Sequence, residues 1–330
     1  MRKFRPTWIF FLSISILVLT SQSANSVWNG ESAIGHKRAV AIFPDPSISC
    51  GASGFLYSPR IVFTVAHTLF LADDRSEIHS EKNMAKKLWV GIPGEKISPN
   101  SKRIESIKFF WPENYASRDA WLGGKRITRN NDFAVLVLKE PLPVDNKKVE
   151  LLTPEQHNQF ISSQEVVTQV GYGSQKSSDV GNTNGCMYER EPKRYESSVT
   201  SKNIDVGNEI WTAPLNFKVG VRKPNGCDGD SGSGYFIEYP DKYLYFGAMG
   251  AGSKANHNCE SYEPFMDKES INGSWPVYLY LDLIKEAEDY VAANPYVAPV
   301  VEKTIKCVKG KKTKKITAPI PKCPTGYKQK

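Results

Sequence analysis

Short runs rich in β-branched and aromatic residues recur along the middle of the chain, and this pattern constrains the fold most. Three of them span residues 60–65 (RIVFTV), 133–138 (FAVLVL) and 165–170 (EVVTQV). Gly, Pro, Asn or Ser residues bound the runs and no helical pattern separates them, which is typical of an all-β barrel or sandwich. One helix is expected at 281–293, where apolar residues recur at helical spacing. They are Leu281, Ile284, Ala287 and Val291.

Charge is distributed unevenly along the 330 residues, whose formal net charge is +8. Residues 1–26 contribute +3 and residues 301–330 contribute +9, which leaves −4 for residues 27–300. Because the body of the chain is mildly acidic, the basic total is no sign of nucleic-acid binding, and none is expected. The length suffices for two folding units or one large β domain.

The first 26 residues have the pattern of an export signal. A basic start at 1–5 precedes an apolar stretch at 8–19 that is too short to span a bilayer comfortably. Small residues at Ala24 and Ser26 suit a signal peptidase, so we expect the cut after Ser26. An uncleaved membrane anchor is the alternative. In a secreted protein, the six cysteines are expected to be largely paired.

Three motifs in the β-rich part carry groups for nucleophilic chemistry. His67 ends the segment TVAH after one apolar run, and Asp132 opens another in NDFAVL. Ser231 lies inside the glycine-rich turn CDGDSGSG. A base, a carboxylate that orients it and a hydroxyl are the groups that acyl transfer requires. The order His, Asp, Ser excludes the α/β-hydrolases, in which the serine comes first.

With these motifs in this order, residues 27–291 resemble the chymotrypsin/trypsin-like serine endopeptidases. The resemblance implies an all-β fold with two six-stranded antiparallel β-barrels, at about 27–145 and 146–280, followed by the helix at 281–293. The expected segments are a signal peptide (1–26), a protease domain (27–293), a linker (294–302) and a basic tail with two cysteines (303–330).

The resemblance also implies a role for each site residue. Ser231 would be the nucleophile, His67 the general base, and Asp132 the group that orients His67 and stabilises its imidazolium form. The backbone N–H groups of Gly229 and Ser231 would form the oxyanion hole. The implied activity is hydrolysis of protein or peptide substrates through an acyl-enzyme intermediate, by a secreted monomer that needs no cofactor or metal. The alternative is a catalytically silent relative that binds envelope or partner proteins.

Residues 27–31 (VWNGE) resemble the mature N-terminus of this family. In the family the freed α-amino group pairs with the acid that precedes the nucleophile, which implies a pair between Val27 and Asp230. Because Val27 directly follows the expected signal cut, we expect export itself to generate the active enzyme. Trimming by another protease is the alternative.

The resemblance places Asn225 near the floor of the primary specificity pocket, where trypsin-like members carry an aspartate. Gly250, Ala251 and Gly252 match the strand that pairs with the substrate backbone. Pro276 is expected to narrow one wall of the pocket. Without a carboxylate at the floor, we expect a preference for small or medium uncharged residues.

The six cysteines form three expected pairs. The resemblance implies a bridge between Cys227 and Cys259 beside the pocket. A bridge between Cys307 and Cys323 would close a basic loop in the tail. Cys50–Cys186 then follows by elimination, among fifteen possible connectivities. In addition, Asn272 opens an Asn-Gly-Ser glycosylation sequon.

The tail at 303–330 resembles the short basic segments with two cysteines that end some secreted bacterial proteins. Its lysines are expected to attract anionic cell-envelope polymers, which would retain the secreted protein at the cell surface. A solvated, weakly ordered tail is the alternative.

Overall fold

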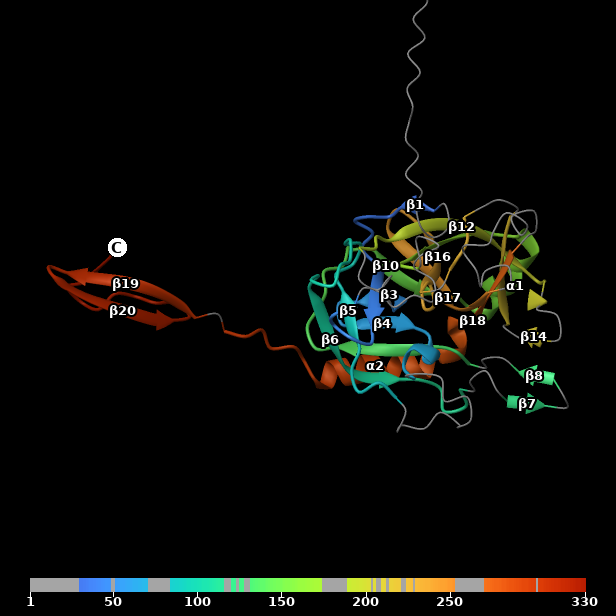
Figure 1. Cartoon of the computed structure of the whole chain (residues 1–330), viewed down its shortest axis with the longest axis horizontal. Coiled ribbons are helices and arrows are strands. Elements are labelled where there is room, and N and C mark those ends of the chain that lie inside the picture. Colours follow the sequence, from blue (N-terminus) through green and yellow to red (C-terminus); the bar gives the residue numbers. More distant parts are fainter. Residues whose placement is uncertain are drawn as a thin grey trace, which may run out of the picture.

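The computed structural model describes a β-rich body and a separate strand pair that extends from it (Figure 1). Every structural statement below concerns the described part of the chain. It comprises residues 30–48, 51–70, 84–115, 120–122, 125–127, 131–173, 189–202, 204–205, 209–211, 214–220, 224–227, 229–252, 270–300 and 302–330.

The first half of the body is a closed six-stranded antiparallel barrel with the order β2-β3-β4-β9-β6-β5. Side chains alternate along its strands, so that Val62 belongs to the core inside this barrel while Phe63 packs in a second core shared with the rest of the body. The strands are β2 (Ala39–Phe43), β3 (Ala52–Ser58), β4 (Ile61–Thr64), β5 (Trp89–Gly91), β6 (Arg103–Phe110) and β9 (Ala134–Leu138).

The second half closes in the same way. Its strands follow the order β12-β11-β16-β17-β18-β15, and β15 pairs back with β12 to complete a ring of six. These strands are β11 (Val166–Gly171), β12 (Lys193–Thr200), β15 (Leu215–Val219), β16 (Gly234–Glu238), β17 (Lys242–Gly252) and β18 (Ser270–Pro276). The all-β fold with two six-stranded barrels, expected from the sequence, is confirmed.

Several short strands lie outside the two rings. β1 (Glu31–Ser32) pairs with β12 of the second barrel, although it precedes the first barrel in the chain, and β10 (Lys148–Leu151) runs parallel to β17. A small four-stranded sheet has the order β13-β14-β8-β7. Its strands are β7 (Ala120–Leu122), β8 (Lys125–Ile127), β13 (Ile204–Asp205) and β14 (Glu209–Trp211).

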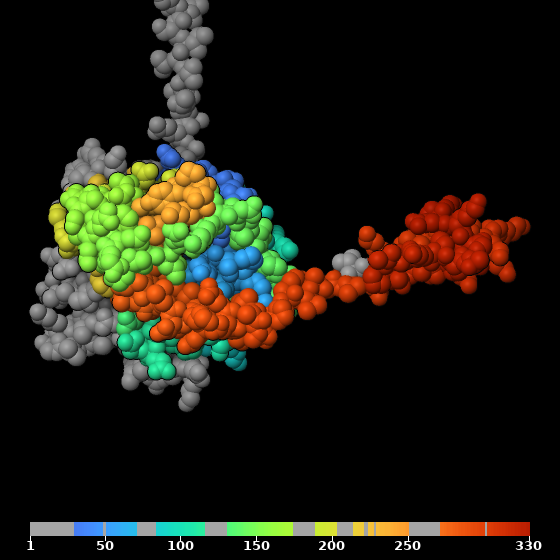
Figure 2. Space-filling view, turned by 180° about the vertical axis from the view of Figure 1, so that it is seen from behind, coloured from blue at the N-terminus to red at the C-terminus, as the bar shows by residue number. Residues whose placement is uncertain are grey.

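The C-terminal helix α2 (Leu281–Ala293) spans the expected residues and follows the 3₁₀ helix η6 (Val277–Tyr280). Ile284 and Ala287 are its buried residues, and the helix runs along the surface of the body before the tail leaves it (Figure 2). It ends before Pro295, because proline disfavours helical geometry in the preceding residue.

A second α-helix, α1 (Pro154–Ser163), was not expected from the sequence, and the expectation of one helix is wrong. Its start is a complete capping box, in which the Thr153 side chain accepts from the N–H of Gln156 and the Gln156 side chain accepts from the N–H of Thr153. Pro154 at the first helical position supports the same start. His157 is its only buried residue, so the helix has little apolar periodicity to reveal it.

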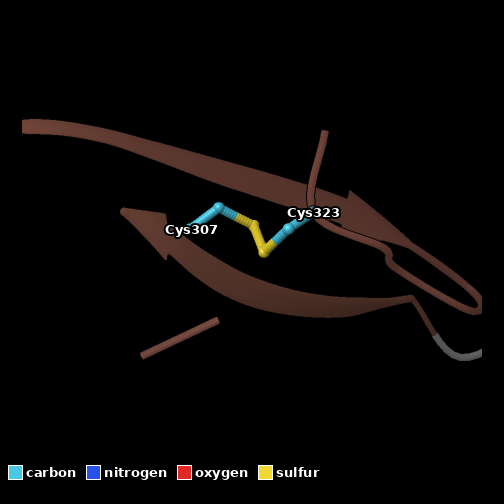
Figure 3. The surroundings of a disulfide bond; sticks show 2 residues. All are labelled: Cys307 and Cys323. Atoms are coloured by element: carbon cyan, nitrogen blue, oxygen red, sulfur yellow. A yellow bond between two sulfur atoms is a disulfide. The ribbon is translucent and has the colours of Figure 1, made fainter. Parts of the chain in front are cut away.

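The tail forms a three-stranded sheet of β19 (Lys303–Lys309), β20 (Lys312–Ala318) and β21 (Lys328–Gln329). The expected disulfide between Cys307 and Cys323 is present, with the two Cα atoms 5.6 Å apart (Figure 3). In the described part of the chain, no helix combines the length and the apolar character needed to cross a membrane.

Candidate active site

His67 and Asp132 lie close together because the strands beside them are paired. β4 leads into the 3₁₀ helix η1 (Ala66–Thr68), which carries His67, while Asp132 lies just before β9. Thr64 at the end of β4 is opposite Ala134 at the start of β9 in an antiparallel pair. Residues that are 65 positions apart in the chain therefore meet at one end of the first barrel.

The Asp132 carboxylate holds His67 through two contacts. Oδ1 accepts from the backbone N–H of His67 at 2.9 Å, and Oδ2 lies 2.7 Å from the ring atom Nδ1. Asp132 is only 1% exposed, whereas the side chain of His67 is 20% exposed. A carboxylate that accepts from Nδ1–H fixes the tautomer in which Nε2 is the basic nitrogen.

The residue after Asp132 is held by the C-terminal segment. The ring of Phe133 stacks on that of Tyr280, with centroids 4.6 Å apart and planes inclined by 6°. The Tyr280 hydroxyl donates to Asn131 Oδ1 at 3.4 Å. Burial, and to a smaller extent the charge of Asp132, raises the pKa of Tyr280, so the phenol stays neutral.

Ser231 lies on a turn whose backbone is bonded to both barrels. The N–H of Ser53 on β3 donates to the carbonyl of Ser231 at 2.8 Å, and the N–H of Gly232 donates to the carbonyl of Met249 on β17 at 2.8 Å. Gly232 has φ 88°, and a Cβ atom there would come within 2.2 Å of Thr64 Oγ1. The turn therefore lies against the strand that leads to η1, and it needs glycine at this position.

Some of the backbone N–H groups of this turn are hydrogen-bonded to backbone carbonyls. The N–H groups of Asp230, Gly232 and Ser233 each donate to a backbone carbonyl. Within the described residues, no backbone carbonyl receives the N–H of Gly229 or Ser231. Gly229 has φ 92°, a conformation that favours glycine. Among the described residues, these two amides, which the resemblance assigns to the oxyanion hole, donate to no backbone carbonyl.

Asp230, the residue before the serine, is fully buried, and its carboxylate holds the turn through two hydrogen bonds. Its Oδ1 accepts from the N–H of Gly173 and its Oδ2 from the N–H of Cys227, both at 2.8 Å. A Cβ atom on Gly171 or Gly173 would come within 2.4 Å of this carboxylate, so only glycine fits there. Val27, its expected partner, lies outside the described residues.

Ser53 on β3 joins the turn to the first barrel, a role that no sequence motif indicates. Its hydroxyl donates to the carbonyl of Gly229 at 2.8 Å and accepts from the N–H of Tyr172 at 2.9 Å. Its carbonyl accepts from the hydroxyl of Thr64 at 2.9 Å. Ser53 is 0% exposed, and its hydroxyl and carbonyl together connect Gly229, Tyr172 and Thr64.

Asn225 is buried, as a residue of the pocket floor would be, and its amide oxygen is engaged. Oδ1 accepts from the N–H of Gly226 at 2.9 Å and from Asn272 Nδ2 at 3.1 Å. Asn272 Nδ2 also lies 3.3 Å from the hydroxyl of Tyr195, which donates to Gln169 Oε1. Burial raises the pKa of Tyr195 and keeps it neutral.

This polar chain continues to the serine turn. Gln169 Nε2 donates to the hydroxyl of Ser233, which donates to the carbonyl of Asp230 at 2.6 Å. All of these residues are buried. Buried side chains that are fully hydrogen-bonded specify one arrangement, so Asn225 is connected rigidly to the turn that carries Ser231.

Asn272, the first residue of the Asn-Gly-Ser sequon, contacts Asn225. Asn272 lies on β18 opposite Gly252 of β17. Pro276 lies at the other end of β18, opposite Gly247 of β17. Strand register therefore brings the side chain of Asn272, at the opposite end of β18 from Pro276, against Asn225. Asn272 is 0% exposed, so the folded protein offers no glycosylation site there.

The remaining predicted residues are placed only in part. Gly250, Ala251 and Gly252 are the last residues of β17 and extend past the β16 ladder, which ends at Ala248. Cys227 is disulfide-bonded. The three cysteines that lie outside the described residues are Cys50, Cys186 and Cys259.

Two antiparallel six-stranded barrels, with a His–Asp pair at the end of one and a serine turn bonded to both, define the chymotrypsin-like class of fold. The trypsin family model matches residues 27–263, and the chain belongs to this family. The resemblance drawn from the motifs is therefore confirmed. No curated protein matches the sequence.

Proposed function

We propose that the protein is a serine endopeptidase that acts through His67, Asp132 and Ser231. The observation that carries this proposal is the buried Asp132 carboxylate bonded to Nδ1 of His67 at 2.7 Å, at the barrel end where the serine turn contacts β4. A carboxylate and an imidazole in this arrangement form the base that a serine nucleophile needs.

In the proposed reaction, His67 Nε2 takes the proton of Ser231 Oγ while that oxygen attacks the carbonyl carbon of the scissile bond. The N–H groups of Gly229 and Ser231 stabilise the oxyanion of the tetrahedral intermediate. Imidazolium at His67 then protonates the leaving amine, which gives the acyl-enzyme. A water molecule, deprotonated by the same nitrogen, hydrolyses the acyl-enzyme and restores Ser231.

Activation is proposed to depend on Asp230. Its carboxylate is fully buried and already accepts from two backbone amides, of Gly173 and Cys227. A freed α-amino group at Val27 would complete the neutralisation of this charge and hold the turn in its working form. Removal of a signal peptide after Ser26 would generate that group directly. N-terminal sequencing of the active protein tests this step, and an active chain that begins before Val27 contradicts it.

The proposed substrates are proteins or peptides with a small or medium uncharged residue before the scissile bond. The support is that Asn225 carries a carboxamide where a cationic side chain would need a carboxylate. The side chain of Asn272 takes up space beside it. A cleavage profile on a peptide library measures the preference. Strong cleavage after Lys or Arg contradicts this assignment.

We propose that the protein is secreted, because residues 1–26 have the pattern of an export signal and cysteines are paired in the structure. The competing function is a silent relative that binds envelope proteins. A fluorophosphonate probe distinguishes the two, because it labels only an activated serine. Labelling of the native protein, lost in Ser231→Ala and in His67→Ala, supports the enzyme. Absence of labelling in the correctly processed native protein supports the silent relative.

A further inference from the structure

The two faces of the tail sheet differ in what covers them. Side chains alternate along β19, so Ile305 and Cys307 lie on one face, together with Ile316 of the paired strand. Cys307 is fully buried, and its disulfide to Cys323 brings residues 319–327 back across this face. This is the covered face.

The opposite face is called the open face. Across it, Lys306 of β19 lies directly opposite Lys315 of β20. β21 extends it, since Lys328 lies opposite Val308 and the N–H of Lys330 donates to the carbonyl of Lys306 at 2.9 Å. All of its side chains are exposed except that of Val308, which is half-buried. The open face consists of Thr304, Lys306, Val308, Thr313, Lys315, Thr317, Lys328 and Lys330.

Like charges are aligned across all three strands of the open face. Lys315, Lys306 and Lys330 form a row, with neighbouring strands about 4.8 Å apart. Directly opposed like charges destabilise a sheet. Residues 303–330 contain ten lysines, no arginine and no acidic residue, and among the described residues no carboxylate forms an ion pair with any of them. Among the described residues, therefore, no carboxylate side chain offsets this repulsion.

The sheet is held together by other means. The Cys307–Cys323 disulfide joins its covered face, and the hydroxyls of Thr304 and Thr317 are hydrogen-bonded across the strands at 2.8 Å. The hairpin turn places Gly310 at φ 56°, in the position where a two-residue turn of type II′ needs a positive φ. A sheet braced in this way fixes the backbone positions from which the lysine side chains extend into the solvent.

The side chains of the open face decide which anion it suits. Lysine is a point charge without the planar fork that arginine offers. The lysines therefore select a partner by its density of negative charge and not by the shape of one anionic group. No aromatic side chain lies on it to stack with nucleic-acid bases. Val308 is its only apolar side chain, too little to enter a bilayer. Threonine hydroxyls between the lysines suit a partner that is itself rich in hydroxyl groups.

We propose that the open face binds a linear anionic polymer of the cell envelope, built from sugars or polyols that carry phosphate or carboxylate. Such a polymer would neutralise the lysine row and hold the protein at the surface. The linker at 294–302 separates the tail from a body whose net charge is −4, which the same polymer repels. This binding does not depend on catalysis.

The test uses the full secreted protein and two immobilised probes, poly(glycerol phosphate) and polygalacturonate, with neutral dextran as a blank. The open-face variant is Lys306→Gln/Lys315→Gln/Lys328→Gln. Its matched control, Lys303→Gln/Lys309→Gln/Lys312→Gln, removes the same charge from side chains that alternate onto the covered side. One lysine near an anionic surface contributes about five-fold in affinity, so the open-face variant should bind at least one probe roughly 100-fold more weakly.

The control variant should lose no more than about five-fold, and native binding should weaken as salt is added. The probe that is bound identifies the anion as phosphate or carboxylate. Equal losses in both variants, no binding to either probe at low salt, or tighter binding to duplex DNA or phosphatidylserine vesicles would overturn the proposal. Hydrogen exchange of residues 303–318 verifies that both variants keep the sheet, and labelling by the fluorophosphonate probe verifies the body independently.

Discussion

The indole ring of Trp275 occupies the space over Gly250 that a side chain would need. A Cβ atom at position 250 would lie 2.6 Å from Cζ3 of Trp275 and 3.1 Å from Oδ2 of Asp132. Both Trp275 and Asp132 are almost fully buried. The ring is therefore packed where it shields the carboxylate from water, and this packing requires glycine at 250.

Gly250→Ser is expected to lower kcat/KM by up to about 100-fold, because Trp275 or Asp132 must shift to make room and a small displacement of the catalytic groups is costly. Overpacking should also reduce the free energy of unfolding by about 1–3 kcal/mol. Peptide hydrolysis and urea unfolding measure the two effects.

The double variant Gly250→Ser/Trp275→Leu tests the cause. If the indole ring is what the serine displaces, the smaller leucine should restore part of the lost activity. Additive losses in the double variant would show that Gly250 acts through something other than Trp275.

Ser53→Ala should damage the site, because it removes the hydrogen-bond partner of the half-buried carbonyl of Gly229 and of the buried N–H of Tyr172. We expect a loss of about 1–3 kcal/mol in the free energy of unfolding. We also expect a fall in kcat, since the carbonyl of Gly229 belongs to the turn whose amides are proposed to stabilise the oxyanion.

Ser106→Ala is the matched control. Ser106 on β6 is almost as buried and likewise joins two backbone groups, but these are the N–H and carbonyl of Leu88 and not groups of the serine turn. It should cost similar stability and leave kcat unchanged. If both variants lose activity in proportion to stability, Ser53 has no special part in the site.

Asn225→Asp should shift the cleavage preference toward Lys and Arg. A carboxylate at this buried position needs a cationic partner, and the substrate side chain would supply it. Measurement of kcat/KM on substrates that differ only in the residue before the scissile bond gives the answer. An unchanged ranking of those substrates would mean that Asn225 does not face the pocket.

We expect His36 to make the stability of the fold sensitive to acid. Burial lowers its pKa from 6.5 to about 4; the charges of Arg194 and Arg38 act in the same direction, and those of Glu238 and Asp145 oppose it. The unfolded chain binds a proton at about pH 6.5, whereas the folded protein does not until about pH 4. Stability is therefore complete above 6.5 and falls as the pH is lowered, by about 2 kcal/mol at pH 5.

His36→Asn should remove this loss. Asparagine does not titrate, and its oxygen replaces Nδ1 as the acceptor for the N–H of Ala39, which lies 3.0 Å away in the native protein. Urea unfolding at about pH 7.5 and pH 5 compares the two proteins. The same pH dependence in both would assign the acid sensitivity to other groups.

Removal of the tail disulfide in Cys307→Ser/Cys323→Ser should unfold the tail and leave the body intact. The bridge closes a loop of 16 residues, which corresponds to a stabilisation of about 3 kcal/mol. Faster hydrogen exchange at 303–318 with unchanged peptide hydrolysis is the expected result. Native protection in the variant would mean that strand pairing alone maintains the sheet.

The elements that followed from the sequence are those that local pattern specifies. The β-branched runs that became β4 and β9 have no competing helical period, and the α2 residues Ile284 and Ala287 recur at helical spacing. Helix α1 has a capping box but almost no buried face, so its start was visible only in Thr153 and Gln156. The spacing of apolar residues reveals a helix or strand only when that element buries an apolar face.

The amino-acid order alone predicted that a histidine, an aspartate and a serine act together, because each lies in a motif beside a strand or in a glycine turn. Only the tertiary structure decided which other residues serve the site. Ser53, Asn272 and Trp275 carry no local signal, since their roles arise from strand register and from contacts between segments far apart in the chain. Hydrogen bonds and close packing act over a few ångströms in space, and the separation of two residues along the sequence does not show whether they are that close.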